Sequence, residues 1–412
     1  MYFLVGLGVW LSIESIYYVY IRQIVYKKVC SFKNRSSTNP TDCVKSLFDL
    51  LESSKTYTFK MWVTNLFLKN GSNIGLDNFK SCISWLHYYS PIQEISNDQL
   101  AHVSNISTQL FDRFQMDTQT TNNADIKHIN LGTGCPSYFH MPLCISSMLD
   151  AMNLYHSIFY FYRKGFKQYK CGGLTYWVYL KEGCTKDPYL FMHGITIGMH
   201  WYSSLIDELM KERSVFLIVN DGIRIGSRNI EIQCQELVVC AVKIILERHY
   251  VNKVLLMGHS WGTFWATWII KGIPHKVSHL TMLDPLANFI FLPETVDYIC
   301  YKKPVTLVEY IIYYFIRNDL AVSNSLHHVR WYDIMLEYKN IPSDIGVIIC
   351  IGGKDELLHI PTVLEITDNY IASRPKEYAP FIKLYYPDFV HGECKNNPDS
   401  VKELLTFLKL NR

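Results

Sequence analysis

The stretch VLLMGHSWG at residues 254–262 decides the fold of this chain. Its four apolar residues predict a buried strand, and the residues that follow it are compatible with a helix. Between them, the pattern G-x-S-x-G at Gly258, Ser260 and Gly262 is typical of a sharp turn that projects a serine hydroxyl above the end of a sheet. Glycine at these two positions lets the helix and the neighbouring strands approach closely. Ser260 is therefore the candidate nucleophile, and His259 belongs to the same turn.

The size and composition narrow the classes of protein. The chain has 412 residues, enough for two or three structural units, of which 49% are hydrophobic and 19% charged. Its formal net charge is only +3, and no basic run is interleaved with aromatic residues. We therefore expect no nucleic acid partner. The 12 cysteines show neither C-x-x-C pairs nor the spacing of a zinc site, so we expect no metal and a reducing compartment.

The first segment indicates a contact with a membrane. From Tyr2 to Ile21 the only charged residue is Glu14, and a basic cluster follows at Arg22, Lys27, Lys28, Lys33 and Arg35. About 20 apolar residues suffice to cross a bilayer, so we interpret residues 1–24 as a transmembrane or membrane-anchoring helix. The basic flank favours a single-pass anchor with the rest of the chain in the cytosol. A cleaved signal peptide and, because of Glu14, an amphipathic helix lying in the interface are the alternatives.

The rest of the chain divides by its hydrophobic pattern. Residues 25–167 show helical periodicity and predict a helical N-terminal region. From residue 168 to 412, short apolar runs alternate with helical stretches, which predicts an α/β fold with a mostly parallel sheet and helices on both faces. The expected strands cover residues 174–180, 189–192, 215–219, 254–257, 279–283, 345–351 and 382–386. The expected helices of this part cover residues 201–213, 231–248 and 263–271.

Residues whose side chains or backbone groups could take part in catalysis follow four of these strands. Catalytic groups of such a sheet gather at the carboxyl ends of its strands. His193 and Gly194 follow one strand, where the glycine lets the loop fold close to Ser260 and present a backbone N–H. We expect the N–H groups of Ile195 and Trp261 to form an oxyanion hole.

An acid and a histidine complete the candidate site. Asp355 follows the next-to-last strand, and His391 follows the last one. His391 would take the proton of Ser260, and Asp355 would fix the imidazole tautomer. Asp284 is an alternative acid, because it also ends a strand, but Pro285 and the following apolar run favour a turn-capping role for it.

These motifs resemble the α/β-hydrolase superfamily, of the AB hydrolase-1 type, from about Gln168 to the C-terminus. The resemblance is carried by Phe191-Met192-His193-Gly194, the turn at Ser260, the block from Gly352 to Leu357, and His391-Gly392. Several further runs resemble poorly characterised membrane-anchored hydrolases of lower eukaryotes, a resemblance that implies an N-terminal membrane helix and no defined substrate. These runs are residues 193–202, 283–285, 301–304 and 326–328. The superfamily places a helical cap where residues 286–344 are inserted here.

The resulting hypothesis is a membrane-anchored serine hydrolase of carboxylic esters, with no cofactor. The aromatic and aliphatic residues of the cap, such as those at 310–315, suit an apolar small molecule or a lipid acyl ester. Packing of these residues against the sheet or the helical region is the equally weighted alternative. A catalytically silent membrane-tethered scaffold and an acyltransferase are the competing functions. The sequence leaves the oligomeric state open.

Overall fold

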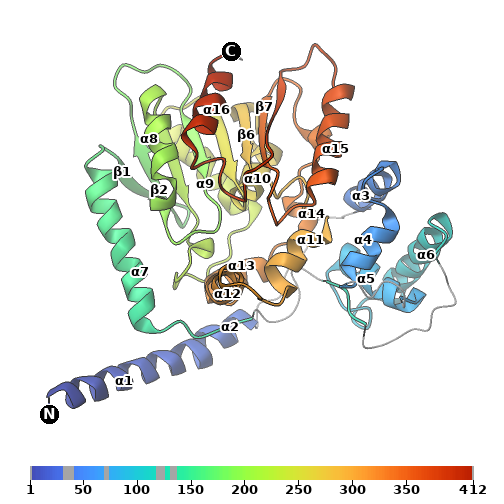
Figure 1. Cartoon of the computed structure of the whole chain (residues 1–412), viewed down its shortest axis with the longest axis horizontal. Helices are drawn as coiled ribbons and strands as arrows, with labels where there is room; N and C mark the ends of the chain where they lie inside the picture. The colour runs from blue at the N-terminus through green and yellow to red at the C-terminus, as the bar shows by residue number, and fades with distance from the viewer. Residues whose placement is uncertain (1, 31–40, 69–73, 117–125, 130–136, 411–412) are drawn as a thin grey trace.

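A mixed eight-stranded sheet forms the centre of the molecule (Figure 1). The computed structural model describes all residues except 1, 31–40, 69–73, 117–125, 130–136 and 411–412. The strand order is β1-β2-β4-β3-β5-β6-β7-β8, with β1 and β2 antiparallel to their neighbours and the remaining pairs parallel. The strands are β1 (Lys167–Cys171), β2 (Leu174–Tyr179), β3 (Tyr189–Met192), β4 (Val215–Val219), β5 (Val254–His259), β6 (Val277–Leu283), β7 (Gly346–Gly352) and β8 (Phe381–Tyr386).

The predicted α/β class is confirmed, and the seven predicted strands are present with small shifts at their ends. The strand that sequence reasoning missed is β1, which lies at the edge of the sheet and pairs only with β2. Its residues are mostly exposed and include Lys167 and Lys170, so it lacks the apolar run by which the buried strands are recognised.

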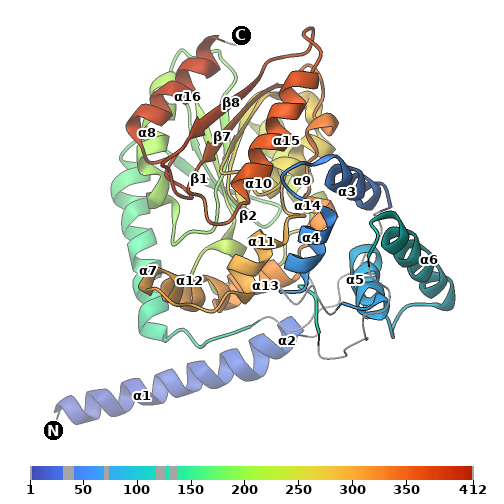
Figure 2. The same ribbon diagram turned by 45° about the vertical axis from the view of Figure 1, so that its right-hand side comes forward.

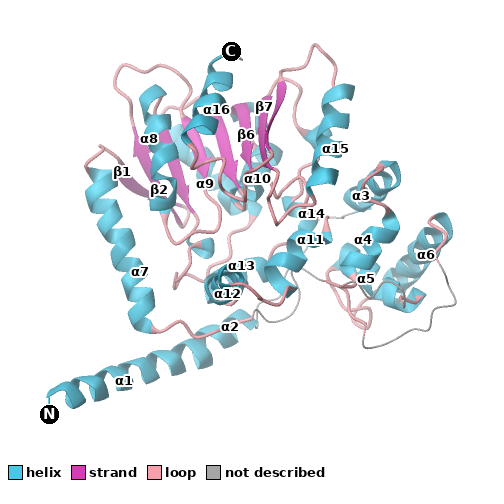
Figure 3. Cartoon of the chain, viewed as in Figure 1, coloured by secondary structure: helices cyan, strands magenta, loops and turns pink. Residues whose placement is uncertain are grey.

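Helices cover both faces of the sheet (Figure 3). One face packs against α8 (Ser203–Glu212) and α16 (Pro398–Leu410). The other packs against α9 (Gln235–Arg248), α10 (Gly262–Gly272) and α15 (Ile360–Ser373). Strands buried on both sides in this way are continuously apolar, as β5 and β7 are, because neither face contacts water.

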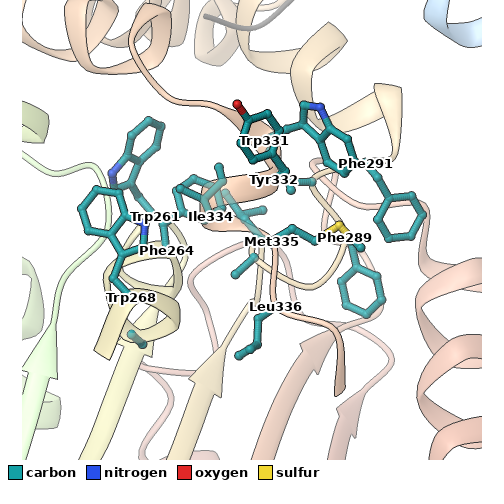
Figure 4. Close-up of a cluster of buried hydrophobic side chains, with 14 of the residues drawn as sticks. Trp261, Phe264, Trp268, Phe289, Phe291, Trp331, Tyr332, Ile334, Met335 and Leu336 are labelled. Atoms are coloured by element: carbon teal, nitrogen blue, oxygen red, sulfur yellow. The ribbon is translucent and has the colours of Figure 1, made fainter. Parts of the chain in front are cut away.

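The insertion between β6 and β7 carries short helices: α11 (Pro293–Val296), α12 (Leu307–Ile312), α13 (Leu320–His327) and α14 (Trp331–Ile334). Figure 4 shows side chains of the insertion, among them Phe291, Trp331 and Ile334, in the same buried cluster as Trp261, Phe264 and Trp268 at α10. The aromatic run that includes Tyr310 and Tyr314 behaves differently, since these two side chains are exposed on α12 and the turn after it. Some aromatic side chains of the predicted cap are thus buried in the core, and others are exposed on the surface.

The N-terminal helices join the same core. They are α3 (Thr41–Ser53), α4 (Phe59–Leu66), α5 (Leu76–Tyr88) and α6 (Asn97–Arg113), and they lie beside the insertion and α15 (Figure 2). The indole of the buried Trp62 donates a hydrogen bond of 2.9 Å to the carbonyl of Phe291 in the insertion. Glu365 of α15 accepts hydrogen bonds from Ser54 Oγ and from the N–H of Lys55, both at 2.7 Å.

The last helix of the predicted N-terminal region, α7 (Leu143–His156), packs elsewhere. It runs along the β1 and β2 side of the sheet (Figure 1). Asn153 donates a hydrogen bond of 2.9 Å to the carbonyl of Ile197 in the loop after β3. Residues 25–167 therefore contain helices that pack in two separate places.

The first helix, α1 (Tyr2–Tyr20), forms where the membrane anchor was predicted, but the transmembrane prediction is not supported. None of the helices that the structure describes combines the length and apolar character needed to cross a bilayer. The helix has 19 residues and contains Ser12, Glu14 and Ser15. The Glu14 carboxylate is tied to the chain, because it lies 2.6 Å from His140 Nε2 and accepts the N–H of Leu143 at 2.9 Å. This contact connects α1 to the beginning of α7.

The turn after β5 yields a test of packing. A Cβ atom on Gly262 would lie 2.1 Å from the carbonyl oxygen of Met192 on β3, which is backbone that cannot rotate away. We expect Gly262→Ala to lower the free energy of unfolding by about 3 kcal/mol or more. In α1, a Cβ on Gly8 meets nothing within 4 Å, so Gly8→Ala should leave the denaturation midpoint unchanged or slightly raised. Equal midpoints for the two variants in urea would contradict this account.

Candidate active site

Ser260 lies on a strained turn between β5 and α10. Its φ is 52°, in the left-handed region that residues other than glycine rarely adopt. The turn is fixed by the Ser260 N–H, which donates to the carbonyl of Leu283 at 2.9 Å at the end of β6. A serine held in this way presents its hydroxyl above the carboxyl edge of the sheet. Only 6% of the residue is exposed.

The structure brings His391 and Asp355 to this serine. His391 Nε2 lies 2.9 Å from Ser260 Oγ, and His391 Nδ1 lies 2.7 Å from Asp355 Oδ2. Asp355 follows β7, and His391 lies in the loop after β8. The second carboxylate oxygen of Asp355 accepts the N–H of Leu357 at 2.9 Å, which holds the carboxylate in place. Three residues spread over 131 positions of the chain thus form one hydrogen-bonded row.

The hydrogen bonds among Ser260, His391 and Asp355 determine which ring nitrogen of His391 carries a proton. Because the Asp355 carboxylate only accepts, His391 Nδ1 carries a proton and Nε2 is left to accept the hydroxyl proton of Ser260. Burial by itself would lower the pKa of His391, but the nearby carboxylates of Asp355 and Asp284 outweigh it and raise that pKa above its ordinary value. The side chain of Asp355 is fully buried, whereas 24% of the His391 side chain is exposed. The site therefore contains a base that reaches solvent and a shielded anion behind it.

The two backbone N–H groups predicted to form an oxyanion hole belong to Trp261 and Ile195. Trp261 is the N-cap of α10, so its N–H is at the positive end of the helix. Ile195 lies in the loop after β3, which is fixed because the N–H of Thr196 bonds to the carbonyl of Ile223. Within the described part of the chain, neither the Ile195 N–H nor the Trp261 N–H donates to another backbone group. Both remain available to an incoming oxygen.

The loop after β3 packs directly against Ser260. A Cβ on Gly194 would lie 2.9 Å from His259 Nδ1 and 3.0 Å from Ser260 Cβ, so only glycine fits there. The neighbouring His193 points elsewhere. Its Nε2 accepts the N–H of Asn220 at 2.8 Å, and burial lowers the pKa of its imidazole. His193 therefore shapes the loop as a neutral buried residue, and it is Gly194 that faces the site.

The alternative acid, Asp284, does not contact the imidazole of His391 directly. Its carboxylate accepts the N–H of Gly392 at 2.8 Å and lies 3.6 Å from His259 Nε2. The residue is fully buried and has a φ of 46°. It is therefore more than the turn cap that the sequence suggested.

Sequence reasoning missed two side chains in this region. The hydroxyl of Tyr202 accepts the N–H of Gly194 at 2.9 Å, and the buried Lys395 lies with its ammonium 4.8 Å from the Tyr202 ring centroid. Lys395 belongs to no recognisable motif, and Tyr202 ends the run at residues 193–202 without an assigned role. The signal that could have found them is their position, eight residues after Gly194 and four residues after His391. Among the described residues, no group of His, Cys, Asp and Glu is arranged to hold a metal ion.

The strand order, the strained serine after β5, the acid after β7 and the histidine after β8 occur together in one topology. The chain has the α/β-hydrolase fold. No family model matches the chain, and no curated protein matches its sequence.

Solved structures with the α/β-hydrolase fold are among those similar to the chain. A bacterial membrane phospholipase A described as a virulence factor is 14% identical, with a TM-score of 0.44, over 65% of this chain and 95% of that one. An α/β-hydrolase fold protein from Chitinophaga pinensis is 14% identical, with a TM-score of 0.43, over 59% and 96%. Naproxen esterase from Bacillus subtilis is 12% identical, with a TM-score of 0.44, over 64% and 98%.

The contact between His391 and Asp355 predicts how the imidazole titrates. We expect the NMR titration midpoint of His391 to lie above 6.5, the ordinary histidine value, because the carboxylates favour the imidazolium. Asp355→Asn removes one of these charges and should lower the midpoint. The signal is assigned by its absence from His391→Gln. A native midpoint below 6.5, or one that Asp355→Asn leaves in place, would show that the carboxylate does not act on this ring.

Proposed function

We propose that this protein is a serine hydrolase of carboxylic esters. The observation that carries the proposal is the continuous row Ser260 Oγ, His391 Nε2, His391 Nδ1 and Asp355 Oδ2, with separations of 2.9 and 2.7 Å. A hydroxyl is a weak nucleophile at neutral pH and becomes reactive when a base within hydrogen-bond distance removes its proton. The two backbone N–H groups beside Ser260 supply the complementary part, which is stabilisation of negative charge on a carbonyl oxygen.

The reaction proceeds in two halves. Ser260 Oγ attacks the ester carbonyl carbon while His391 Nε2 takes the hydroxyl proton, and the N–H groups of Ile195 and Trp261 bind the oxyanion. His391 then donates this proton to the leaving alcohol, which gives an acyl-enzyme. Water attacks the acyl-enzyme with His391 as base, and the acid leaves as Ser260 recovers its proton. Asp355 stays ionised and stabilises the imidazolium throughout. No cofactor takes part.

A serine-directed probe tests this function. We expect a fluorophosphonate to label the native chain at Ser260, and Ser260→Ala to abolish both labelling and hydrolysis of acyl esters. Ser373→Ala, at an exposed serine that ends α15, is the matched control and should label like the native chain. Absence of labelling in a folded native chain would favour a silent scaffold. Acyl transfer to an added alcohol in preference to water would favour an acyltransferase.

The substrate class we propose is an apolar or lipid acyl ester met at a membrane surface. Support comes from α1, where the described side chains from residue 5 onward are largely exposed and apolar, including Val9, Ile13 and the 71% exposed Ile16. Ile21 and Val29, just after α1, pack against Leu320, which holds this end of the helical segment against α13. The exposed Phe139 lies 5.3 Å from the Tyr314 ring, and Leu307 on α12 is 77% exposed.

The basic residues that follow α1 support the same membrane contact. Arg22, Lys27 and Lys28 follow the apolar helix, and basic residues next to an apolar surface favour the anionic lipids of the cytoplasmic leaflet. In this proposal α1 lies along the surface of the membrane with its apolar side chains in the interface, and the rest of the chain lies in the cytosol.

Vesicle binding tests the lipid contact. We expect the full chain to co-sediment with vesicles of phosphatidylcholine and phosphatidylserine, and more weakly without phosphatidylserine. Ile16→Glu should reduce the partition coefficient roughly tenfold or more, since burying an isoleucine contributes about 1.5–3 kcal/mol. Leu237→Glu, at an exposed residue of α9, is the control and should bind like the native chain. Equal binding of the two variants, or no binding to anionic vesicles at low salt, would refute this contact.

A further inference from the structure

A second chain of polar contacts lies behind the candidate nucleophile. The N–H of Gly194 donates to the hydroxyl of Tyr202 at 2.9 Å, and that hydroxyl lies 2.9 Å from His259 Nδ1. On the other side of the same imidazole, His259 Nε2 lies 3.6 Å from Asp284 Oδ2, slightly beyond a hydrogen bond. The same carboxylate oxygen accepts the N–H of Gly392 at 2.8 Å.

The two ends of this second chain lie next to residues of the candidate site. Gly194 precedes Ile195, the residue that offers an oxyanion donor, and Gly392 follows His391, the candidate base. In the middle, His259 is the residue before Ser260. Ile195, Ser260 and His391 are thus each one residue away from a member of this second chain.

We propose that Asp284, His259 and Tyr202 are positioning residues. They hold the loop after β3, which carries Gly194, and the loop after β8, which carries Gly392, at a fixed separation around Ser260. The proposal rests on the serine hydrolase function stated above. None of the three side chains touches the serine hydroxyl, and they act through the backbone of Gly194 and Gly392.

Proton positions along the chain are consistent. The Tyr202 hydroxyl accepts from Gly194, so its own proton is free to go to His259 Nδ1. His259 then carries its proton on Nε2, facing the Asp284 carboxylate. Burial lowers the pKa of His259 to about 4, so the ring is neutral at pH 7. A neutral ring between a hydroxyl and an anion adds no second positive charge beside His391.

The burial of Asp284 argues for a role. The carboxylate is fully buried, and isolated charges in such places are costly. The groups that face it are the N–H of Gly392, His259, the Cys394 thiol with Sγ 3.7 Å from Oδ1, and, at longer range, Lys395 and His391. Burial alone would raise the pKa of Asp284, but His259, His391 and the Gly392 N–H keep it below its ordinary value. The residue therefore remains an anion near the imidazole.

Position and charge can be separated by substitution. In Asp284→Asn the amide oxygen still accepts the N–H of Gly392, whereas Asp284→Ala removes both the acceptor and the charge. Tyr202→Phe removes only the hydroxyl that holds Gly194. Tyr250→Phe is the matched control, because Tyr250 is 97% exposed.

Hydrogen exchange tests the positioning without relying on catalysis. We expect the amides of Gly194 and Gly392 to exchange slowly in the native chain. Tyr202→Phe should speed exchange at Gly194, and Asp284→Ala should speed it at Gly392, while Tyr250→Phe changes neither. Unchanged exchange in folded Tyr202→Phe and Asp284→Ala would overturn the proposal even if the native chain proves to have no esterase activity.

Kinetics test the consequence for the site. With an ester substrate, Tyr202→Phe and Asp284→Ala should lower kcat by about 10- to 100-fold with KM little changed, as small misplacements of reacting groups do. Asp284→Asn should keep more activity than Asp284→Ala and should move the acid limb of kcat/KM to lower pH, because Asp284 helps to raise the pKa of His391. Native kcat and an unmoved limb in all three folded variants would overturn the inference. Failure of the native chain to react with a fluorophosphonate would instead refute the serine hydrolase function.

Discussion

The candidate site depends on how closely three backbone segments meet at Ser260. Gly262 lies so near the end of β3 that one extra carbon would reach the carbonyl of Met192, and Gly194 of the next loop is pressed against Ser260 and His259 in the same way. Beside these contacts the serine adopts a left-handed conformation, with a φ of 52°, and the loop that carries Gly194 and Ile195 lies against it. Strain of this kind persists only where the surroundings over-determine it. The candidate nucleophile and the loop with a candidate oxyanion donor therefore form one packing arrangement.

Local sequence patterns were sufficient to predict the elements that have a simple pattern of residue types. The buried strands are continuous apolar runs, and the turn after β5 has its own signature, so both could be located without a structure. Likewise Asp355 and His391 follow strands, and the structure places them beside Ser260. By contrast, β1 has no apolar pattern, because an edge strand of this kind is exposed on most of its length.

Contacts between distant residues could not be predicted. Glu14 looked like a costly charge in a membrane helix, but it reaches His140, which is 126 positions away, and no local pattern encodes such a contact. Tyr202 and Asp284 pose the same difficulty, since their partners become neighbours only after the sheet has formed. The apolar composition of the first segment predicted a span, whereas none of the described helices is long and apolar enough to cross a membrane.

The shared core of the N-terminal helices and the insertion has a consequence for how the chain can be divided. Trp62 and Tyr57 reach across to Phe291 and Glu294, and the apolar side chains around them are buried by both partners. A fragment beginning at β1 would retain every strand and every reactive group, yet it would expose this wide aromatic surface to water. Such a fragment should self-associate. We therefore expect a fragment that stays monomeric to need α3–α6, although none of these helices carries a residue of the candidate site.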